Sequence, residues 1–137
     1  MNDRYLHHKN VVDRLVEEYH KYGNIIVAYD YDGTVHDYHK NGDTYLNVMN
    51  LLKDLKPYAK FIVYTCSPTE RYEEIINYLE VYGLPMDTIN ENIVKLNDNC
   101  CAKLYYNIML DDRCGLESAF FALTDFLEII KKEEKQQ

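Results

Sequence analysis

The chain has 137 residues, of which 47% are hydrophobic, so it is long enough for one domain with a buried core. Its net charge of −8 argues against binding along an extended nucleic acid, which requires clustered Lys and Arg. The N-terminus is polar and no apolar run is long enough to cross a membrane, so we expect a cytoplasmic protein.

We expect a single domain over residues 1–137. Residues 11–22 place apolar side chains on one face at helical spacing, and Gly23 is suited to end that helix. Residues 1–22 are therefore predicted to be an N-terminal helical extension, which either covers the sheet or mediates oligomer formation. Residues 131–137 are rich in Lys, Glu and Gln, and we expect a disordered tail there.

The middle of the chain alternates apolar runs with turn residues. Residues 24–30 form a short apolar run rich in β-branched residues, which is typical of a strand buried on both faces. A helix is predicted to begin near Asp43 or Thr44 and to end at Pro57, and residues 59–65 are predicted to form a second buried strand.

The sequence SPTE follows that strand and has the composition of a helix start. Ser67 is predicted to cap the helix, Pro68 to occupy its first position and Glu70 to complete a capping box. This helix should end at about Tyr82, because Gly83 follows.

The last third of the chain is expected to supply one clear strand and one helix. Residues 86–102 allow one or two short strands, around 86–89 and 92–96. Residues 104–110 are predicted to form a strand, and an amphipathic helix should begin at Leu116.

Strands that alternate with helices predict a three-layer α/β/α Rossmann-like fold with a mainly parallel sheet. In such sheets ligands bind outside the carboxyl ends of the strands. Three predicted strand ends carry Asp30, Thr65 and Asp111, so distant parts of the sequence should meet at one edge of the sheet.

Four carboxylates follow two of these strands: Asp30, Asp32, Asp111 and Asp112. Such a group would repel itself without a cation, and oxygen ligands favour a hard ion, Mg²⁺ first. A bound Mg²⁺ attracts phosphate oxygens, as would Lys103 and the Thr65 hydroxyl. The pattern therefore favours phosphoryl transfer, with one aspartate as nucleophile and a second as acid and base.

The two early aspartates stand two residues apart and should face the same side of a regular strand. Gly33 directly after them lets the chain turn away sharply. Both carboxyl groups could then reach one phosphorus atom.

The motifs DYDGTV, VYT, Lys103 and LDDR occur in this order over residues 24–115. They closely resemble the four signature motifs of the haloacid dehalogenase superfamily, most of whose members are Mg²⁺-dependent phosphatases. The intervals between the motifs leave no room for the inserted cap domain that members usually carry. The chain therefore resembles a small, capless member of that superfamily.

The resemblance implies that Asp30 is the nucleophile and that Asp32 is the general acid and base, with its backbone carbonyl on the metal. It also implies that Thr65 and Lys103 bind the transferred phosphoryl group; Lys95 is the alternative to Lys103. We place Gly33 with these two residues in the substrate-binding set.

For the late aspartate pair, the resemblance implies that Asp111 and Asp112 serve the Mg²⁺ site. Which of the two contacts the ion stays open.

A capless site would depend for its selectivity on the short segment 35–43. His36, Tyr38 and His39 could stack on a base or sugar, and a solvated turn with incidental aromatic residues is the alternative. Tyr31, between the two early aspartates, is the tyrosine whose position suggests contact with a substrate.

These observations predict a Mg²⁺-dependent phosphomonoesterase that acts on a phosphorylated small molecule through a phosphoaspartate. A nucleotidase or a phosphatase of nucleic-acid ends is the narrower alternative. A metal-binding regulatory module without turnover is the alternative outside the enzymes.

Overall fold

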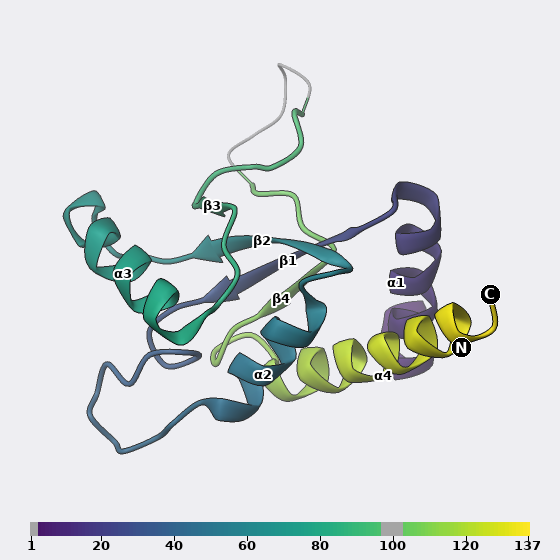
Figure 1. Cartoon of the computed structure of the whole chain (residues 1–137), viewed down its shortest axis with the longest axis horizontal. Helices are drawn as coiled ribbons and strands as arrows, with labels where there is room; N and C mark the ends of the chain where they lie inside the picture. Colours follow the sequence, from purple (N-terminus) through teal and green to yellow (C-terminus); the bar gives the residue numbers. More distant parts are fainter. Residues whose placement is uncertain (1–2, 97–102) are drawn as a thin grey trace.

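The computed structural model describes residues 3–96 and 103–137. Helices and strands alternate along most of the chain (Figure 1). The elements are η1 (Arg4–Leu6), α1 (His8–Tyr22), β1 (Ile25–Asp30), α2 (Leu46–Leu55), β2 (Ala59–Tyr64), η2 (Thr69–Arg71), α3 (Tyr72–Tyr82), β3 (Thr88–Ile89), β4 (Ile108–Leu110) and α4 (Leu116–Lys135).

The four described strands form one parallel sheet in the order β3-β2-β1-β4. In the register, Asp30 of β1 pairs with Tyr64 of β2, and Tyr29 pairs with Leu110 of β4. The chain passes from β1 to β2 and β3 on one side, whereas β4 lies on the other side of β1. The sheet therefore reverses its winding between β1 and β4, and its carboxyl edge carries the ends of β1, β2 and β4.

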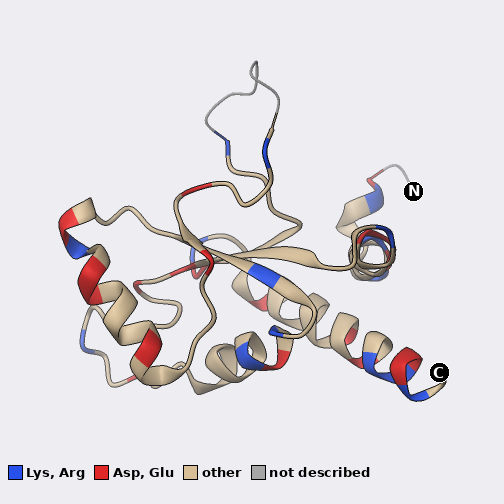
Figure 2. Ribbon diagram, turned by 45° about the horizontal axis from the view of Figure 1, so that its top comes forward, with Lys and Arg blue, Asp and Glu red and all other residues tan. Residues whose placement is uncertain are grey.

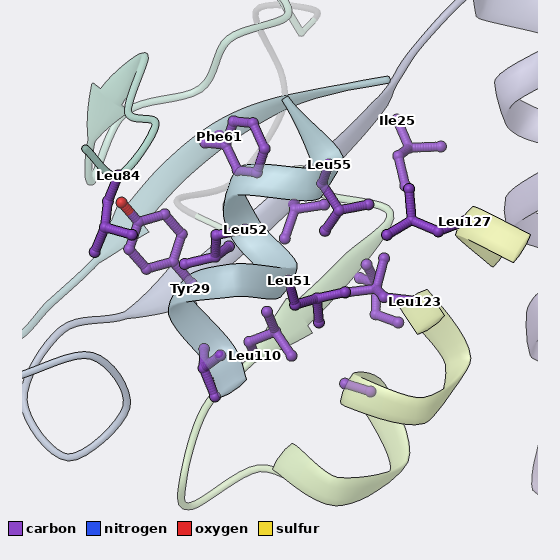
Figure 3. Close-up of a cluster of buried hydrophobic side chains, with 14 of the residues drawn as sticks. Ile25, Tyr29, Leu51, Leu52, Leu55, Phe61, Leu84, Leu110, Leu123 and Leu127 are labelled. Carbon is purple, nitrogen blue, oxygen red and sulfur yellow. The ribbon is translucent and has the colours of Figure 1, made fainter. Parts of the chain in front are cut away.

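The main core lies on one face of the sheet, against side chains of the four α-helices. Figure 3 shows residues of this cluster from the sheet, α2 and α4 packed together. On the other face, a smaller cluster of Ile26, Ala28 and Ile62 is covered by partly buried side chains, among them Ile93 and Leu104. Burial on both faces explains why β1 has no charged residue before Asp30.

The architecture is a mainly parallel sheet with flanking helices, consistent with the predicted three-layer α/β/α Rossmann-like fold. The predicted helix 11–22, the buried strand 24–30 and the strand 59–65 are confirmed within one to three residues at their ends. The long apolar and amphipathic patterns were sufficient to identify these elements.

The helix α2 begins two to three residues later than predicted. The helix begins at Leu46, and Tyr45 before it has a left-handed backbone with a φ of 55°. This conformation interrupts the helical geometry expected from Asp43 or Thr44 onward. Residues 31–45 are therefore a longer connection than the sequence predicted.

The strand predictions for residues 86–110 are confirmed in part. Residues 88–89 form the short strand β3, but residues 92–96 are irregular, and 97–102 lie outside the described residues. The strand predicted over 104–110 is confined to Ile108–Leu110. The Asn107 backbone N–H donates to the Ile26 carbonyl at 2.8 Å, but the Ile26 N–H donates to the Asn107 side-chain oxygen at 2.6 Å, so a side chain takes the place of one backbone acceptor there.

The terminal helices α1 and α4 pack against each other. The ring nitrogen Nε2 of His8 lies 2.6 Å from Asp125, and that of His20 lies 2.7 Å from Glu133. The expectation of a disordered tail over 131–137 was wrong, because α4 continues to Lys135 and its last turns contact other elements.

Charged side chains are spread over the helices and connections. Figure 2 shows Lys and Arg on several separate elements rather than on one face of the described chain. In the part of the chain that the structure describes, no helix has both the length and the apolar character to cross a bilayer.

Candidate active site

The carboxyl edge of the sheet carries the candidate site. Asp30 is the last residue of β1, Thr65 follows β2, and Asp111 and Asp112 follow β4. The reversal of winding lies between β1 and β4, which is the position where parallel α/β sheets bind their ligands. The fold thus brings the early and late aspartates to the position where a ligand is expected.

Three of the predicted aspartates form a compact group, which we call the carboxylate cluster: Asp30, Asp111 and Asp112. One carboxylate oxygen from each lies within 4.8 Å of the others. Asp30 and Asp111 are partly buried, and Asp112 is exposed. Oxygen atoms at this spacing are a donor set suited to a hard divalent cation.

The carboxylate cluster raises the pKa of Asp30 to about 7. Burial contributes most to the shift, followed by a hydrogen bond with Asp112 and the negative charge of Asp111. The ionised form of Asp30 is therefore disfavoured unless a positive charge lies nearby, which is the electrostatic condition expected at a cation site.

The side chain of Thr34 connects two members of the carboxylate cluster. It is fully buried, and its hydroxyl lies 3.3 Å from both Asp30 Oδ2 and Asp112 Oδ1. The same oxygen accepts a hydrogen bond from the Asp112 backbone N–H at 3.1 Å. Thr34 thus links the end of β1 to the loop after β4.

The glycine after the early aspartates is required by its surroundings. Gly33 has a φ of +84°, and a Cβ atom there would lie 2.9 Å from a carboxylate oxygen of Asp112. A side chain would therefore strain the backbone and displace Asp112. The role of Gly33 seen here is to let the two loops approach each other; binding of substrate by Gly33 stays a prediction.

The fourth predicted aspartate, Asp32, is not a member of the carboxylate cluster. Asp32 lies beyond the end of β1, and its carboxylate joins His36 and Arg71 in a group that we call the arginine cluster. Arg71 Nη1 donates to Asp32 Oδ2 at 2.8 Å, and His36 Nδ1 lies 2.8 Å from Asp32 Oδ1. The regular strand alternation that would have kept Asp30 and Asp32 together ends at Asp30.

The arginine cluster lowers the pKa of Asp32, whereas the pKa of Asp30 is raised. Burial of Asp32 raises its pKa, but the hydrogen bonds from Arg71 and His36 outweigh burial and hold the pKa below its ordinary value. Two aspartates separated by one residue therefore favour opposite protonation states.

Thr65 and Ser67 are connected through their side chains. Thr65 is buried, and its hydroxyl donates to the Ser67 oxygen at 2.9 Å. Ser67 also accepts a hydrogen bond from Arg71 Nη1 at 2.8 Å. The predicted capping role of Ser67 was wrong, because its oxygen is engaged with Thr65 and Arg71, and α3 begins only at Tyr72 without a side-chain cap.

The lysine predicted for the site lies apart from these contacts. Lys103 is exposed, and among the described residues no ion pair or hydrogen bond joins it to the carboxylates or to Thr65. The chain after Lys103 reaches the sheet at Asn107, which bonds to Ile26 near the amino end of β1. Lys95 is also exposed, so the structure brings neither lysine into the clusters, and their roles stay predictions.

The aromatic residues near Asp32 are packed against one another. Tyr31 is fully buried, so its predicted contact with a substrate was wrong. The His36 ring stacks on Tyr31 at a centroid distance of 4.7 Å and meets Tyr78 edge-on at 5.0 Å. Tyr38 and His39 remain exposed beside the site.

Sequence reasoning missed two residues of this edge, Thr34 and Arg71. The signal for Thr34 was present, because it is the threonine of the DYDGT motif and therefore immediately follows Gly33. No comparable motif in the sequence pointed to Arg71. It reaches Asp32 only because the short helix η2 turns it back toward β1.

Comparisons with other proteins support the architecture. No protein-family model matches the chain, and no curated protein matches it. A solved structure, described as that of a conserved protein coded by a locus from Bacteroides thetaiotaomicron, is similar, with a TM-score of 0.59 and 24% sequence identity. The match covers 80% of this chain and 92% of that chain, and at this identity it shows the fold alone.

Proposed function

We propose that the protein is a Mg²⁺-dependent phosphomonoesterase that forms a phosphoaspartate at Asp30. The observation that carries the proposal is the carboxylate cluster, with three carboxylate oxygens within 4.8 Å at the reversal of the sheet. The resemblance of its motifs to the haloacid dehalogenase superfamily supports the same reaction.

The donor set fits a magnesium ion. The carboxylates of Asp30, Asp111 and Asp112 would hold it, and the Asp32 backbone carbonyl is the further ligand that the resemblance implies. When bound, Mg²⁺ supplies positive charge that offsets the carboxylates and the phosphoryl oxygens. The raised pKa of Asp30 agrees with this fit, because such a carboxylate is ionised most readily when a cation is present.

The first chemical step is an attack by an Asp30 carboxylate oxygen on phosphorus. A bond forms between this oxygen and phosphorus, the ester P–O bond breaks, and the leaving oxygen takes its proton from the protonated form of Asp32. In the second step Asp32 accepts a proton from water and the water oxygen bonds to phosphorus. The bond between the Asp30 oxygen and phosphorus breaks, so inorganic phosphate leaves and the Asp30 carboxylate is restored.

Arg71 and His36 favour one of the two states that Asp32 needs. They hydrogen-bond the ionised carboxylate, which is the form that accepts a proton from water. The first step requires the protonated form, so substrate binding must weaken at least one of these hydrogen bonds before the leaving oxygen is protonated.

The test is phosphate release by the purified protein with Mg²⁺ and with EDTA. The substrates are an aryl phosphate and a panel of phosphorylated metabolites, nucleotides and nucleic-acid ends. Asp30→Asn should lower turnover at least about a thousandfold, because the nucleophile is removed. Asp54→Asn, an exposed carboxylate on α2, is the matched control and should keep wild-type turnover. Absence of Mg²⁺-dependent turnover across the whole panel would contradict the proposal.

A metal-binding regulatory module is the second candidate. It is favoured by one specific observation: Asp32 is paired with Arg71, and no described contact brings Lys103 to the carboxylates. Such a module would bind aluminium fluoride together with Mg²⁺, detectable by fluorine NMR, but would release no phosphate from any member of the panel. Turnover that depends on Asp30 would exclude it.

A further inference from the structure

Arg71 is the cationic side chain that the described part of the structure places against the candidate site. Its Nη1 donates to Asp32 Oδ2 and to the Ser67 oxygen, both at 2.8 Å, and its Nη2 lies 3.4 Å from Asp32 Oδ1. The side chain keeps 25% of its surface exposed. It is therefore anchored at one side and accessible at the other.

The guanidinium group is held in orientation by two aromatic rings. Its central carbon lies 5.8 Å from the centroid of Tyr31 and 5.6 Å from that of Tyr38. Nε is 3.7 Å from Glu74, which is an ion pair at long range. A planar fork fixed in this way loses little conformational freedom when it binds a further group.

The fork retains donor capacity. A guanidinium carries five N–H hydrogens, two of them on Nη2. The described contacts of Nη2 use one of these hydrogens, at 3.4 Å to Asp32. Among the described contacts one Nη2 hydrogen is therefore left for a phosphate oxygen, and hydrogen bonds between charged groups are among the strong ones.

Ser67 offers a second donor at the same place. Its oxygen accepts from Thr65 and from Arg71, so its own hydroxyl hydrogen is left for another acceptor. Thr65, Ser67, Arg71 and Asp32 thus form one hydrogen-bonded chain that runs across the ends of β1 and β2.

The charge of the site calls for such a cation. The carboxylate cluster carries up to three negative charges, and one Mg²⁺ offsets two of them. A phosphate monoester would add further negative charge to this edge. An additional positive group is needed for the ester to bind, and Lys103 makes no described contact there.

We propose that Arg71 and Ser67 bind the phosphoryl oxygens of the substrate, a phosphate monoester, at the mouth of the site. The inference rests on the proposed function, from which it takes the phosphate-ester ligand and the bound Mg²⁺. Arg71 shares its donors between Asp32 and the phosphoryl group, so substrate binding weakens the hold of Arg71 on Asp32. Arg71 thereby supplies the positive charge that the sequence assigned to Lys103.

The test is the binding of inorganic phosphate in the presence of Mg²⁺, measured by titration calorimetry. Arg71→Gln should weaken binding about tenfold or more, because a hydrogen bond between charged groups is lost. Arg71→Lys should weaken it less, since the charge is kept and the fork is lost. Ser67→Ala should weaken it about two- to tenfold, as expected for a neutral donor.

The matched control is Arg14→Gln. Arg14 has surroundings similar to those of Arg71, a carboxylate at 3.3 Å in Glu18 and an aromatic ring at 4.5 Å in Tyr5, but it lies on α1. This variant should bind phosphate as the wild type does. Circular dichroism establishes that each variant is folded, and Arg71→Lys serves as the test if Arg71→Gln does not fold.

The inference is overturned if the folded Arg71 variants bind phosphate as tightly as the wild type, or if the wild type binds none. It is also overturned if Lys103→Gln removes binding and Arg71→Gln does not. Arg71-dependent phosphate binding without turnover would leave the inference standing and contradict the phosphatase. Turnover whose KM is the same in Arg71→Gln and the wild type would support the phosphatase and contradict the inference.

Discussion

Two neighbouring groups at the edge of the sheet shift the pKa of an aspartate in opposite directions. In the carboxylate cluster, burial and the acidic partners raise the pKa of Asp30 to about 7. In the arginine cluster, hydrogen bonds from Arg71 and His36 hold the pKa of Asp32 below its ordinary value despite burial. The sequence separates these aspartates by one residue, and their distant partners give them different properties. A nucleophile and a proton-transfer group need such a difference.

The largest effect that tests this comparison is expected from Asp32→Asn. Loss of the acid and base should lower turnover of an alkyl phosphate about a hundredfold or more. An aryl phosphate should be affected less in its first step, because its leaving oxygen is less basic and needs less protonation. Steady-state kinetics with both substrates measure the difference.

The Mg²⁺ affinity distinguishes the two clusters when one aspartate of each is replaced. Asp32→Asn should leave the Mg²⁺ affinity measured by calorimetry little changed, because the Asp32 side chain lies outside the carboxylate cluster. Asp111→Asn should weaken it. If both variants weaken Mg²⁺ binding equally, the division into two clusters is wrong.

A smaller effect is expected from Gly33→Ala, which acts on the carboxylate cluster alone. The positive φ should lower the free energy of unfolding by about 1 to 2 kcal/mol. The new Cβ should also turn the exposed Asp112 carboxylate away and so weaken Mg²⁺ binding. Urea unfolding and calorimetry measure the two effects separately.

Gly42→Ala is the matched control for this substitution. Gly42 has a φ of +87°, but nothing lies within 4 Å of the position that a Cβ atom would take there. It should show the same loss of stability with unchanged Mg²⁺ affinity. Equal Mg²⁺ affinity in Gly33→Ala and the wild type would contradict the role assigned to the contact with Asp112.

The smallest effect is expected in the pH dependence of stability without metal. The folded pKa of Asp30, about 7, lies above its ordinary value of 3.8, so the folded chain holds this proton more tightly. The contribution of Asp30 to stability is thus present at low pH and is lost as the pH rises from about 4 through 7. Because Asp30 is partly exposed, screening by solvent reduces the effect.

Thermal unfolding in EDTA at several pH values measures this contribution. The melting temperature of Asp30→Asn should rise relative to that of the wild type as the pH increases across this window. The control variant Asp54→Asn should give a curve parallel to the wild type. A constant difference between Asp30→Asn and the wild type at all pH values would show that the carboxylate cluster does not disfavour the ionised form of Asp30.

The sequence predicted the parts of the site that depend on strand ends. Buried apolar runs identify β1 and β2 without ambiguity, and parallel strands place their carboxyl ends at one edge. Asp30, Thr65 and Asp111 were located by this reasoning, and the structure has them at that edge. Asp32 lies beyond the last residue of β1, where strand alternation no longer fixes the side-chain direction, and its carboxylate joins Arg71 and His36.

The remaining residues depend on local backbone geometry that composition does not specify. Arg71 reaches Asp32 through the short helix η2, and Ser67 turns to Thr65 instead of capping a helix. The strand predicted over 104–110 is shortened to Ile108–Leu110, and before it the Asn107 side chain takes the place of one backbone acceptor. Competition between side chains and backbone for the same hydrogen bonds decides these positions, and it is not visible in periodicity.

The pairing of α1 with α4 has a practical consequence for experiments on this protein. Figures 1 and 2 show these two helices on the opposite side of the molecule from α3. The carboxyl edge with Asp30 and Arg71 lies toward α3. An affinity tag, a surface attachment or a fused reporter placed after α4 would therefore leave the candidate site open to substrates.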